Sequence, residues 1–247
     1  MRQIARLNLD PASVTILSSL QKDVDGASDP PARASILWKR QRSGKRRAEA
    51  FGDVRTKLTR MASGRARCMY CEDNLGTDID HFHPKSAYSR QAFVWNNYLV
   101  ACSHCNSNEK RAEFPLDPSG SALLIDPTAD DPVTHLVLVP ETGRLEPVTA
   151  RGTETERVFG LNRRDELTAG RADTWTQLER LVRDVGAGHK RGDRPSVVRL
   201  VREAKRLSFQ CVVHHFVRDA LNLAPAFVSK ALAKTIVATA SEWAWAR

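Results

Sequence analysis

Residues 68–106 read CMYCEDNLGTDIDHFHPKSAYSRQAFVWNNYLVACSHCN and hold four of the five cysteines of this 247-residue chain. They form two CxxC pairs, Cys68 with Cys71 and Cys102 with Cys105, separated by residues 72–101. Each pair offers two thiolates from one tight turn, and two pairs complete the four-sulfur shell that zinc prefers. A closed shell has no open position for a substrate, so the spacing predicts a structural zinc ion.

The alternatives for these cysteines are two disulfides or four unrelated buried thiols. Disulfide frameworks are typical of small secreted domains, whereas this chain is long and has no apolar signal segment at its start. No stretch is long and apolar enough to span a bilayer. We therefore expect reduced, zinc-binding cysteines and a cytoplasmic protein without a membrane association.

An acidic residue and a histidine stand next to each other between the two cysteine pairs. Asp80 offers hard carboxylate oxygens, which suit Mg²⁺ or Mn²⁺. His81, with an ordinary pKa near ~6.5, can accept a proton from water at neutral pH. Neighbouring residues of a strand point to opposite sides, so one can face a metal while the other faces water. Asn106 is a candidate second ligand, and Asn97 can hold the loop that carries His81 through hydrogen bonds to its backbone.

These residues resemble the HNH endonucleases of the ββα-metal type, in the segments DIDHFHPKS, WNNYLVAC and CSHCN. The family usually has histidine at the last motif position, where this chain has Asn106. A narrower resemblance covers roughly residues 51–183 and includes FPLDP, LLIDPTADDP and FGLNRRDEL. Over that span the chain is similar to the HNH subunit of retron and Septu-type antiphage systems.

The resemblance implies an α+β fold, with a zinc-stapled ββα-metal core embedded between helical N- and C-terminal regions. It implies that Asp80 and Asn106 bind one catalytic divalent ion, Mg²⁺ or Mn²⁺, and that His81 is the general base. Asn97 would hold the His81 loop in register. The ion would stabilise charge on the phosphate and the leaving oxygen, giving 5′-phosphate and 3′-hydroxyl ends.

Positive charge is abundant and concentrated. The chain has a net charge of +9, and the run WKRQRSGKRRAEAF at residues 38–51 gathers much of it, which favours a nucleic-acid partner. The alternative for this run is a solvated helix face. His83 and Lys85 lie near the Asp-His pair in the sequence, and they could bind a phosphate or be exposed loop residues. The candidate phosphate contacts are His83, Lys85, Lys39, Arg40, Arg42, Lys45, Arg46 and Arg47.

Patterning divides the chain into a helical, basic region (1–67), the HNH module (68–118), a strand-and-turn segment (119–153) and a helical region (154–247). We expect Asp10 to cap a helix opened by Pro11, a break over residues 23–31, and a second helix carrying Phe51 and Met61. The remaining expected elements are strands near 77–81 and 98–101, a short helix near Cys105, strands in 123–127, 135–140 and 143–148, a helix over 165–185 and a helix from Ser196 through Val212.

Two classes of function account for these features. The first is a metal-dependent HNH endonuclease, with DNA as the expected substrate and an RNA-cleaving toxin or effector as an alternative. The second is a non-catalytic, zinc-stapled nucleic-acid-binding module, which has no use for Asp80, His81 and Asn106 in register. No base-reading or nucleotide-binding motif is present, so targeting falls to a partner. The narrower resemblance implies that this partner is an ATPase subunit of an antiviral defence complex.

Overall fold

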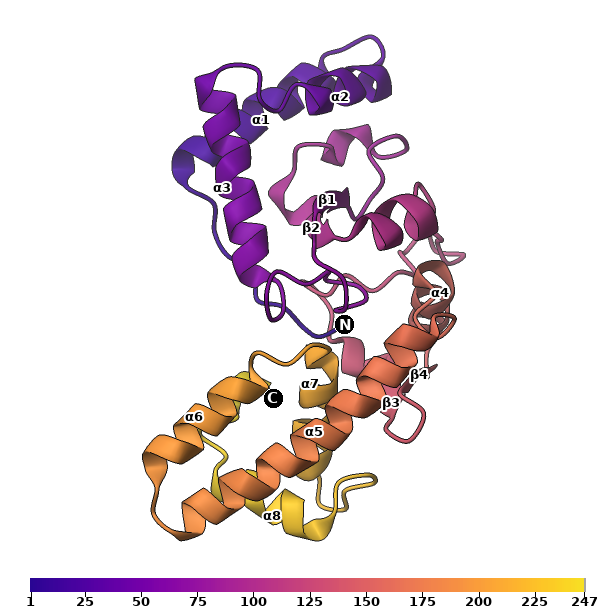
Figure 1. Cartoon of the computed structure of the whole chain (residues 1–247). Coiled ribbons are helices and arrows are strands. Elements are labelled where there is room, and N and C mark those ends of the chain that lie inside the picture. The colour runs from indigo at the N-terminus through magenta and orange to yellow at the C-terminus, as the bar shows by residue number, and fades with distance from the viewer. Residues whose placement is uncertain (247) are drawn as a thin grey trace.

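The computed structural model describes residues 1–246 and has two lobes (Figure 1). One lobe holds α1 (Pro11–Asp25), α2 (Pro30–Lys39) and α3 (Lys45–Met61) beside a small sheet. The other lobe is built from the C-terminal helices. A single hydrophobic core cluster includes residues of both lobes, from Met1 to Ala246. The mixed, mainly helical architecture confirms the predicted fold class.

The N-terminal helices follow the sequence pattern in part. α3 buries Phe51 and Met61 as expected. The break expected over residues 23–31 is shorter, because Pro30 opens α2 and the Asp29 side chain accepts a hydrogen bond from Ala32 N–H, 3.0 Å away. Proline is tolerated in a first helical turn, where its missing N–H would have no helical partner. Asp10 stands at the start of α1 but does not cap it, since its carboxylate pairs with Lys57 at 3.1 Å.

Two antiparallel strands and a helix form the centre of the first lobe. β1 (Asp78–His81) pairs with β2 (Tyr98–Ala101), with Asp80 opposite Leu99. The connection contains the short 3₁₀ turns η1 (Ser89–Gln91) and η2 (Trp95–Asn97). The π-helical segment η3 (His104–Lys110) follows β2. This order confirms the predicted strands and the short helix near Cys105.

The segment after the sheet contains one hairpin where three strands were expected. β3 (Leu136–Val139) pairs with β4 (Arg144–Pro147), and the turn η4 (Pro132–Thr134) precedes them. The strand expected over 123–127 is wrong. Its backbone is irregular, because Ile125 N–H donates to the Thr155 hydroxyl (2.9 Å) and the Asp126 carboxylate turns the chain by accepting Thr128 N–H (2.8 Å).

Five helices and a final turn complete the chain. α5 (Asp165–Lys190) continues five residues past the predicted end at 185. Gly186 lets this helix pack closely against the segment that holds Thr235, because a Cβ at Gly186 would lie 2.8 Å from Thr235 Oγ1. The helix expected over 196–212 is two helices, separated where Phe209 takes a left-handed conformation (φ 53°), and the first is capped by Asp193 rather than Ser196. The elements are α4 (Ala150–Phe159), α5 (Asp165–Lys190), α6 (Arg194–Ala204), α7 (Gln210–Ala220), α8 (Lys230–Ala238) and η5 (Ala244–Ala246).

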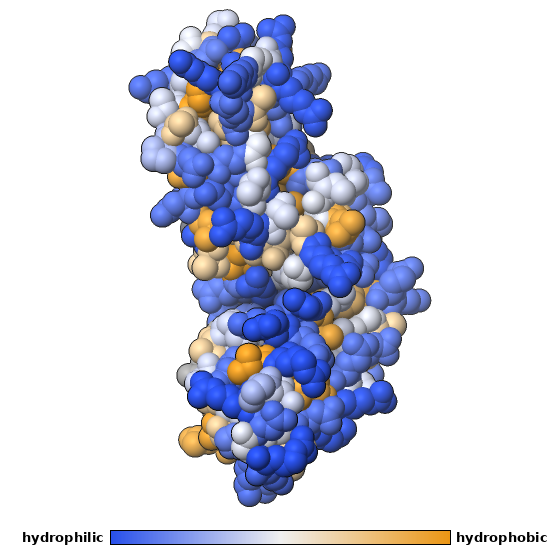
Figure 2. All heavy atoms as spheres, turned by 60° about the vertical axis from the view of Figure 1, so that its left-hand side comes forward, coloured by the Kyte–Doolittle hydropathy of each residue, from blue (hydrophilic) through white to orange (hydrophobic). Residues whose placement is uncertain are grey.

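The surface seen in Figure 2 is mostly hydrophilic, in agreement with the high content of charged residues in the sequence. Figure 2 brings forward the face that carries α1 and α3, and the hydrophobic groups on this face are small and separate. Within residues 1–246, no helix combines the length and the apolar character that a bilayer span requires.

Candidate active site and metal centre

The four motif cysteines converge at one buried point beside the sheet. Their sulfur atoms all lie within 4.8 Å of one another, and Cys71 Sγ is 3.9 Å from Cys102 Sγ. Four sulfurs at 2.3 Å from a tetrahedral zinc ion are about 3.8 Å apart. All four are free thiols in the structure, so the donor set fits zinc and the disulfide alternative does not hold.

A cation from outside the module faces this cluster. Arg164 lies just before α5, and its Nη2 is 3.7 Å from Cys105 Sγ. Four thiolates around a divalent ion leave a net negative charge, which the guanidinium offsets. The C-terminal region is therefore joined electrostatically to the cysteine site.

Asp80 is buried at the centre of a polar cluster. Its side chain is 3 % exposed and accepts hydrogen bonds from Tyr70 O–H (2.5 Å) and from the Lys110 ammonium (3.0 Å). Lys110 is fully buried and also donates to the His81 carbonyl oxygen at 2.7 Å. Burial raises the pKa of Asp80, while Lys110 and Tyr70 act to lower it. The structure therefore places a positive charge against this carboxylate, as an anion in a buried site requires.

The imidazole of His81 faces the other way, as adjacent strand residues do. Its Nε2 is 2.9 Å from the Ala92 carbonyl oxygen, which also accepts Tyr98 O–H at 2.8 Å. A carbonyl oxygen can only accept a hydrogen bond, so Nε2 carries the hydrogen. Nδ1 is then the unprotonated nitrogen of the neutral ring, and its lone pair can accept a proton. Burial lowers the pKa of His81 to about 3, aided by the nearby charges of Lys85 and Lys110. The ring is thus held neutral, in the tautomer that can accept a proton at Nδ1.

Asn97 fastens the loop after β1. Its Oδ1 accepts His83 N–H at 2.7 Å, and its Nδ2 donates to the carbonyl oxygens of His83 (3.0 Å) and Gln91 (2.9 Å). The backbone of Phe82, the residue after His81, donates to the Asn97 carbonyl at 2.9 Å. Asn97 therefore makes the side-chain to backbone bonds expected of a loop-holding residue, at His83 rather than at His81 itself.

Asn106 meets a carboxylate that the sequence analysis did not single out. Its Nδ2 lies 3.2 Å from Asp78 Oδ2, two residues before Asp80 on the same face of β1. Asp78, Asp80 and Asn106 each carry an oxygen of the kind that a hard divalent cation binds, and the contact between Asp78 and Asn106 is present. Of these groups, Asp80 is bound by Lys110 here, so a metal at Asp80 would compete with the ammonium. The joint binding of one ion by Asp80 and Asn106 stays a prediction.

His83 and Lys85 occupy different settings. The His83 ring packs among aromatic rings, with its centroid 4.6 Å from that of Phe114, and its Nδ1 lies 3.2 Å from Asn97 Oδ1. Lys85 Nζ lies 6.0 Å from the centre of the Trp38 ring, and its charge acts on both Asp80 and His81. Lys85 is therefore the better placed of the two to meet a phosphate beside the pair.

The basic run forms the end of α2, the following turn and the start of α3. Its basic side chains are exposed except for that of Arg47, which is half-buried. The charge of Lys39 acts on Lys85, so the run begins beside the Asp-His pair. The first turn of α3 has no acidic residue and no side-chain cap. Three adjacent cations at a positive helix end repel one another and favour a bound anion.

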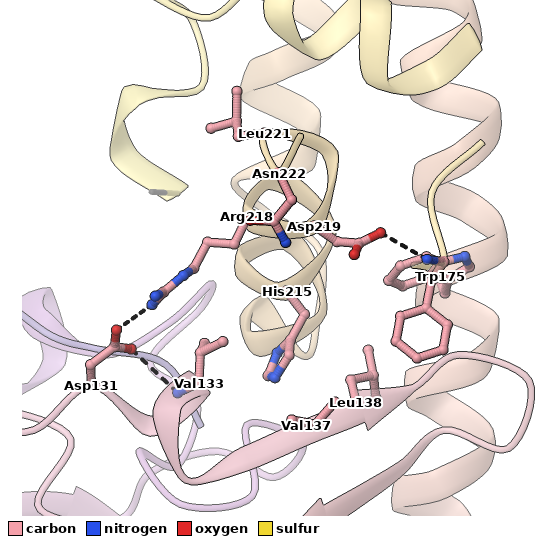
Figure 3. Close-up of a pocket in the computed structure, with 11 residues that line it drawn as sticks. Asp131, Val133, Val137, Leu138, Trp175, His215, Arg218, Asp219, Leu221 and Asn222 are labelled. Atoms are coloured by element: carbon pink, nitrogen blue, oxygen red, sulfur yellow. Dashed lines mark hydrogen bonds and ion pairs between the residues drawn. The ribbon is translucent and has the colours of Figure 1, made fainter. Parts of the chain in front are cut away.

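A separate cavity of about 640 Å³ lies in the C-terminal lobe (Figure 3). Its polar groups are engaged within the chain: both ring nitrogens of His215 are 2.8 Å from carbonyl oxygens, Arg218 pairs with Asp131, and Asp219 accepts three backbone N–H groups. None of the Asp-His site residues lines it. Its apolar walls include Trp175 and Leu138.

Comparison with known families agrees with this geometry. Residues 68–112 match the family model described as HNH endonuclease. The chain therefore carries an HNH domain of nuclease-type fold, flanked by helical regions and containing a four-cysteine site that could hold a metal. A search of the curated proteins finds no match for the chain.

Four further residues of the site were missed from the sequence. Asp78 could have been found, because it alternates with Asp80 on a predicted strand. Lys110 lies one helical turn beyond Asn106, but an isolated lysine carries no signal that it is buried. Tyr70 stands between two of the motif cysteines, and Trp38 lies 43 positions before His81, so only the fold brings them to the pair.

Proposed function

We propose that this protein is a metal-dependent HNH endonuclease that hydrolyses phosphodiester bonds of nucleic acid. The observation that carries the proposal is the pair at the end of β1. Asp80 and His81 are buried on opposite sides, and the fixed tautomer of His81 leaves Nδ1 free to accept a proton. A binding module that only needs zinc and positive charge has no use for this arrangement.

His81 acts as the general base. Its Nδ1 takes the proton of the attacking water, while the hydrogen bond from Nε2 to the Ala92 carbonyl stabilises the resulting imidazolium. Burial keeps the ring neutral before the reaction, and because the same burial opposes formation of the imidazolium, the contact with the Ala92 carbonyl is needed to offset it. Asn97 fixes the loop that follows His81, which keeps the base in place.

Asp80 and Asn106, with Asp78 beside them, hold the catalytic divalent ion, and Mg²⁺ and Mn²⁺ suit their oxygen atoms. When bound, such an ion stabilises negative charge on the phosphate and on the leaving oxygen. Lys85 meets the substrate phosphate from the side of α2. The zinc cluster has a structural role, since its four thiolates leave no position for substrate.

The substrate we propose is DNA, held by its backbone along the basic run from Lys39 to Arg47. These side chains meet phosphates without reading bases, so binding is strongly salt-dependent and weakly sequence-specific. Targeting then comes from a partner, and the resemblance to antiphage HNH subunits favours an ATPase of a defence complex. RNA cleavage by the same site is the second candidate, because the HNH fold is compatible with both polymers.

The experiment presents matched DNA and RNA, single- and double-stranded, to purified zinc-loaded protein with Mg²⁺ or Mn²⁺. We expect DNA cleavage, 5′-phosphate ends, and loss of cleavage in Asp80→Ala at every ion concentration. The variant with both Arg46 and Arg47 changed to Gln should bind DNA more weakly and with a smaller salt dependence. Cleavage of RNA alone would replace the proposed substrate, and equal cleavage by Asp80→Ala would remove this residue as a ligand.

A further inference from the structure

A tryptophan from outside the HNH domain touches the histidine of the pair. Trp38 is in α2, and its ring centroid lies 4.2 Å from that of His81, with 64° between the ring planes. The match to the HNH family covers only residues 68–112. The N-terminal helices therefore supply a wall of the site that the HNH segment does not contain.

Three contacts hold the His81 ring. The Ala92 carbonyl binds Nε2 at 2.9 Å, and the Tyr98 ring stands at 88° to the imidazole with centroids 5.3 Å apart. Both groups belong to the HNH segment. A hydrogen bond at one nitrogen fixes that atom but permits the ring to turn about the bond, which would swing Nδ1 away. The indole of Trp38 opposes this turn.

Trp38 is itself held firmly. Its ring contacts those of Phe51 (5.6 Å), Phe93 (6.1 Å) and Tyr98 (5.5 Å), so it belongs to a packed aromatic cluster. The Lys85 ammonium lies 6.0 Å from the centre of the same ring, at the outer limit for a cation–π contact. One side chain thus borders both the proton acceptor and the lysine that faces substrate.

We propose that Trp38 is a positioning residue of the nuclease site, which fixes the orientation of His81 and thereby makes α2 a required part of that site. This inference rests on the proposed function, since it assigns a role in the same reaction. A displacement of about 1 Å in a reacting group can lower a rate about 10²-fold, so an unrestrained ring has a large effect on kcat.

The test compares Trp38→Leu, Trp38→Phe and Phe51→Leu in the full chain. Phe51 packs on Trp38 and Phe93 in the same cluster but makes no ring contact with His81, so its variant reproduces the loss of an aromatic core residue alone. The measurements are kcat and KM for DNA cleavage, zinc content and thermal unfolding. A readout independent of activity is the rate at which diethyl pyrocarbonate modifies His81, followed by mass spectrometry of the peptide.

We expect Trp38→Leu to lower kcat about 10²-fold with KM nearly unchanged, and to speed the modification of His81. Trp38→Phe should restore most of kcat, because an aromatic edge again meets the ring. Phe51→Leu should lower the unfolding temperature and leave kcat within a fewfold of the parent. A kcat for Trp38→Leu within twofold of the parent, or an equal loss in Phe51→Leu, would overturn the inference.

A parent protein that cuts no nucleic acid would count against the proposed function, and the modification rates would then decide the inference separately. Unchanged modification of His81 in folded Trp38→Leu would show that Trp38 does not restrain the ring. Faster modification of His81 in Trp38→Leu would support the inference that Trp38 restrains the His81 ring, whichever reaction the site catalyses. If Trp38→Leu does not fold, Trp38→Met takes its place as the variant without an aromatic ring, and Trp38→Phe stays the rescue variant.

Discussion

The buried pair of Lys110 and Asp80 gives the sharpest prediction about the site. Lys110→Met keeps the apolar stem and removes the ammonium from a carboxylate that is 3 % exposed. Removing one partner of a buried ion pair costs about 3–5 kcal/mol. Tyr70 O–H still binds Asp80, so we expect a loss near the low end, about 3 kcal/mol in the free energy of unfolding. Urea unfolding at pH 7, with zinc bound and no added Mg²⁺, measures it.

The same variant tests whether Asp80 binds a divalent ion. Because the competing ammonium is absent, Mg²⁺ at one hundred times its dissociation constant should raise the free energy of unfolding of Lys110→Met by about 2.7 kcal/mol. The control is Lys110→Met combined with Asp80→Asn, which keeps Asp78 as its one charged candidate ligand and should gain much less from Mg²⁺ than Lys110→Met alone. A loss below about 1 kcal/mol in Lys110→Met, or equal stabilisation of both variants by Mg²⁺, would refute the reasoning.

Other predictions concern zinc, acid stability and the loop after β1. Cys68→Ser should reduce bound zinc and the unfolding temperature together, because metal binding is coupled to folding; unchanged zinc content by mass spectrometry would contradict the cluster. Burial holds the pKa of His81 at about 3, below its value in the unfolded chain, so its contribution to stability is present above about pH 6.5 and is lost as the pH falls toward 3. His81→Phe should therefore flatten the acid limb of a stability–pH curve, and an unaltered limb would count against the buried neutral ring. Asn97→Ala leaves the His83 backbone without its partners, so we expect a loss of about 1–3 kcal/mol and a lower kcat; normal values of both would dismiss the loop-holding role.

The sequence was most informative where the chemistry imposes local spacing. Two CxxC pairs predicted the converging thiols, and the strands expected near 77–81 and 98–101 are present as β1 and β2, with Asp80 and His81 at the end of β1. Asn97 was expected to bind backbone nearby, and it does. Each of these inferences depends on contacts between residues close in the chain or on a familiar motif.

Longer-range features could not be read from the pattern. The contacts of Lys110 with Asp80 and of Trp38 with His81 are made by tertiary packing across 30 and 43 positions of the chain. The strand expected over 123–127 is wrong because the side chains of Thr155 and Asp130 accept hydrogen bonds from its backbone, at Ile125 N–H and Asp126 N–H. α5 continues past its predicted end because the glycines there allow close helix packing, Gly186 against α8 and Gly188 against α6, rather than breaking the helix.

The most direct test of nuclease function is nicking of supercoiled plasmid by the purified full chain with Mg²⁺ or Mn²⁺. His81→Ala is the variant, and zinc content is measured in both proteins. The account predicts metal-dependent nicking by the parent, its abolition by EDTA, and no nicking by His81→Ala that retains zinc, fold and DNA binding. Nicking by folded His81→Ala at the parent rate would contradict the assignment of His81 as the base.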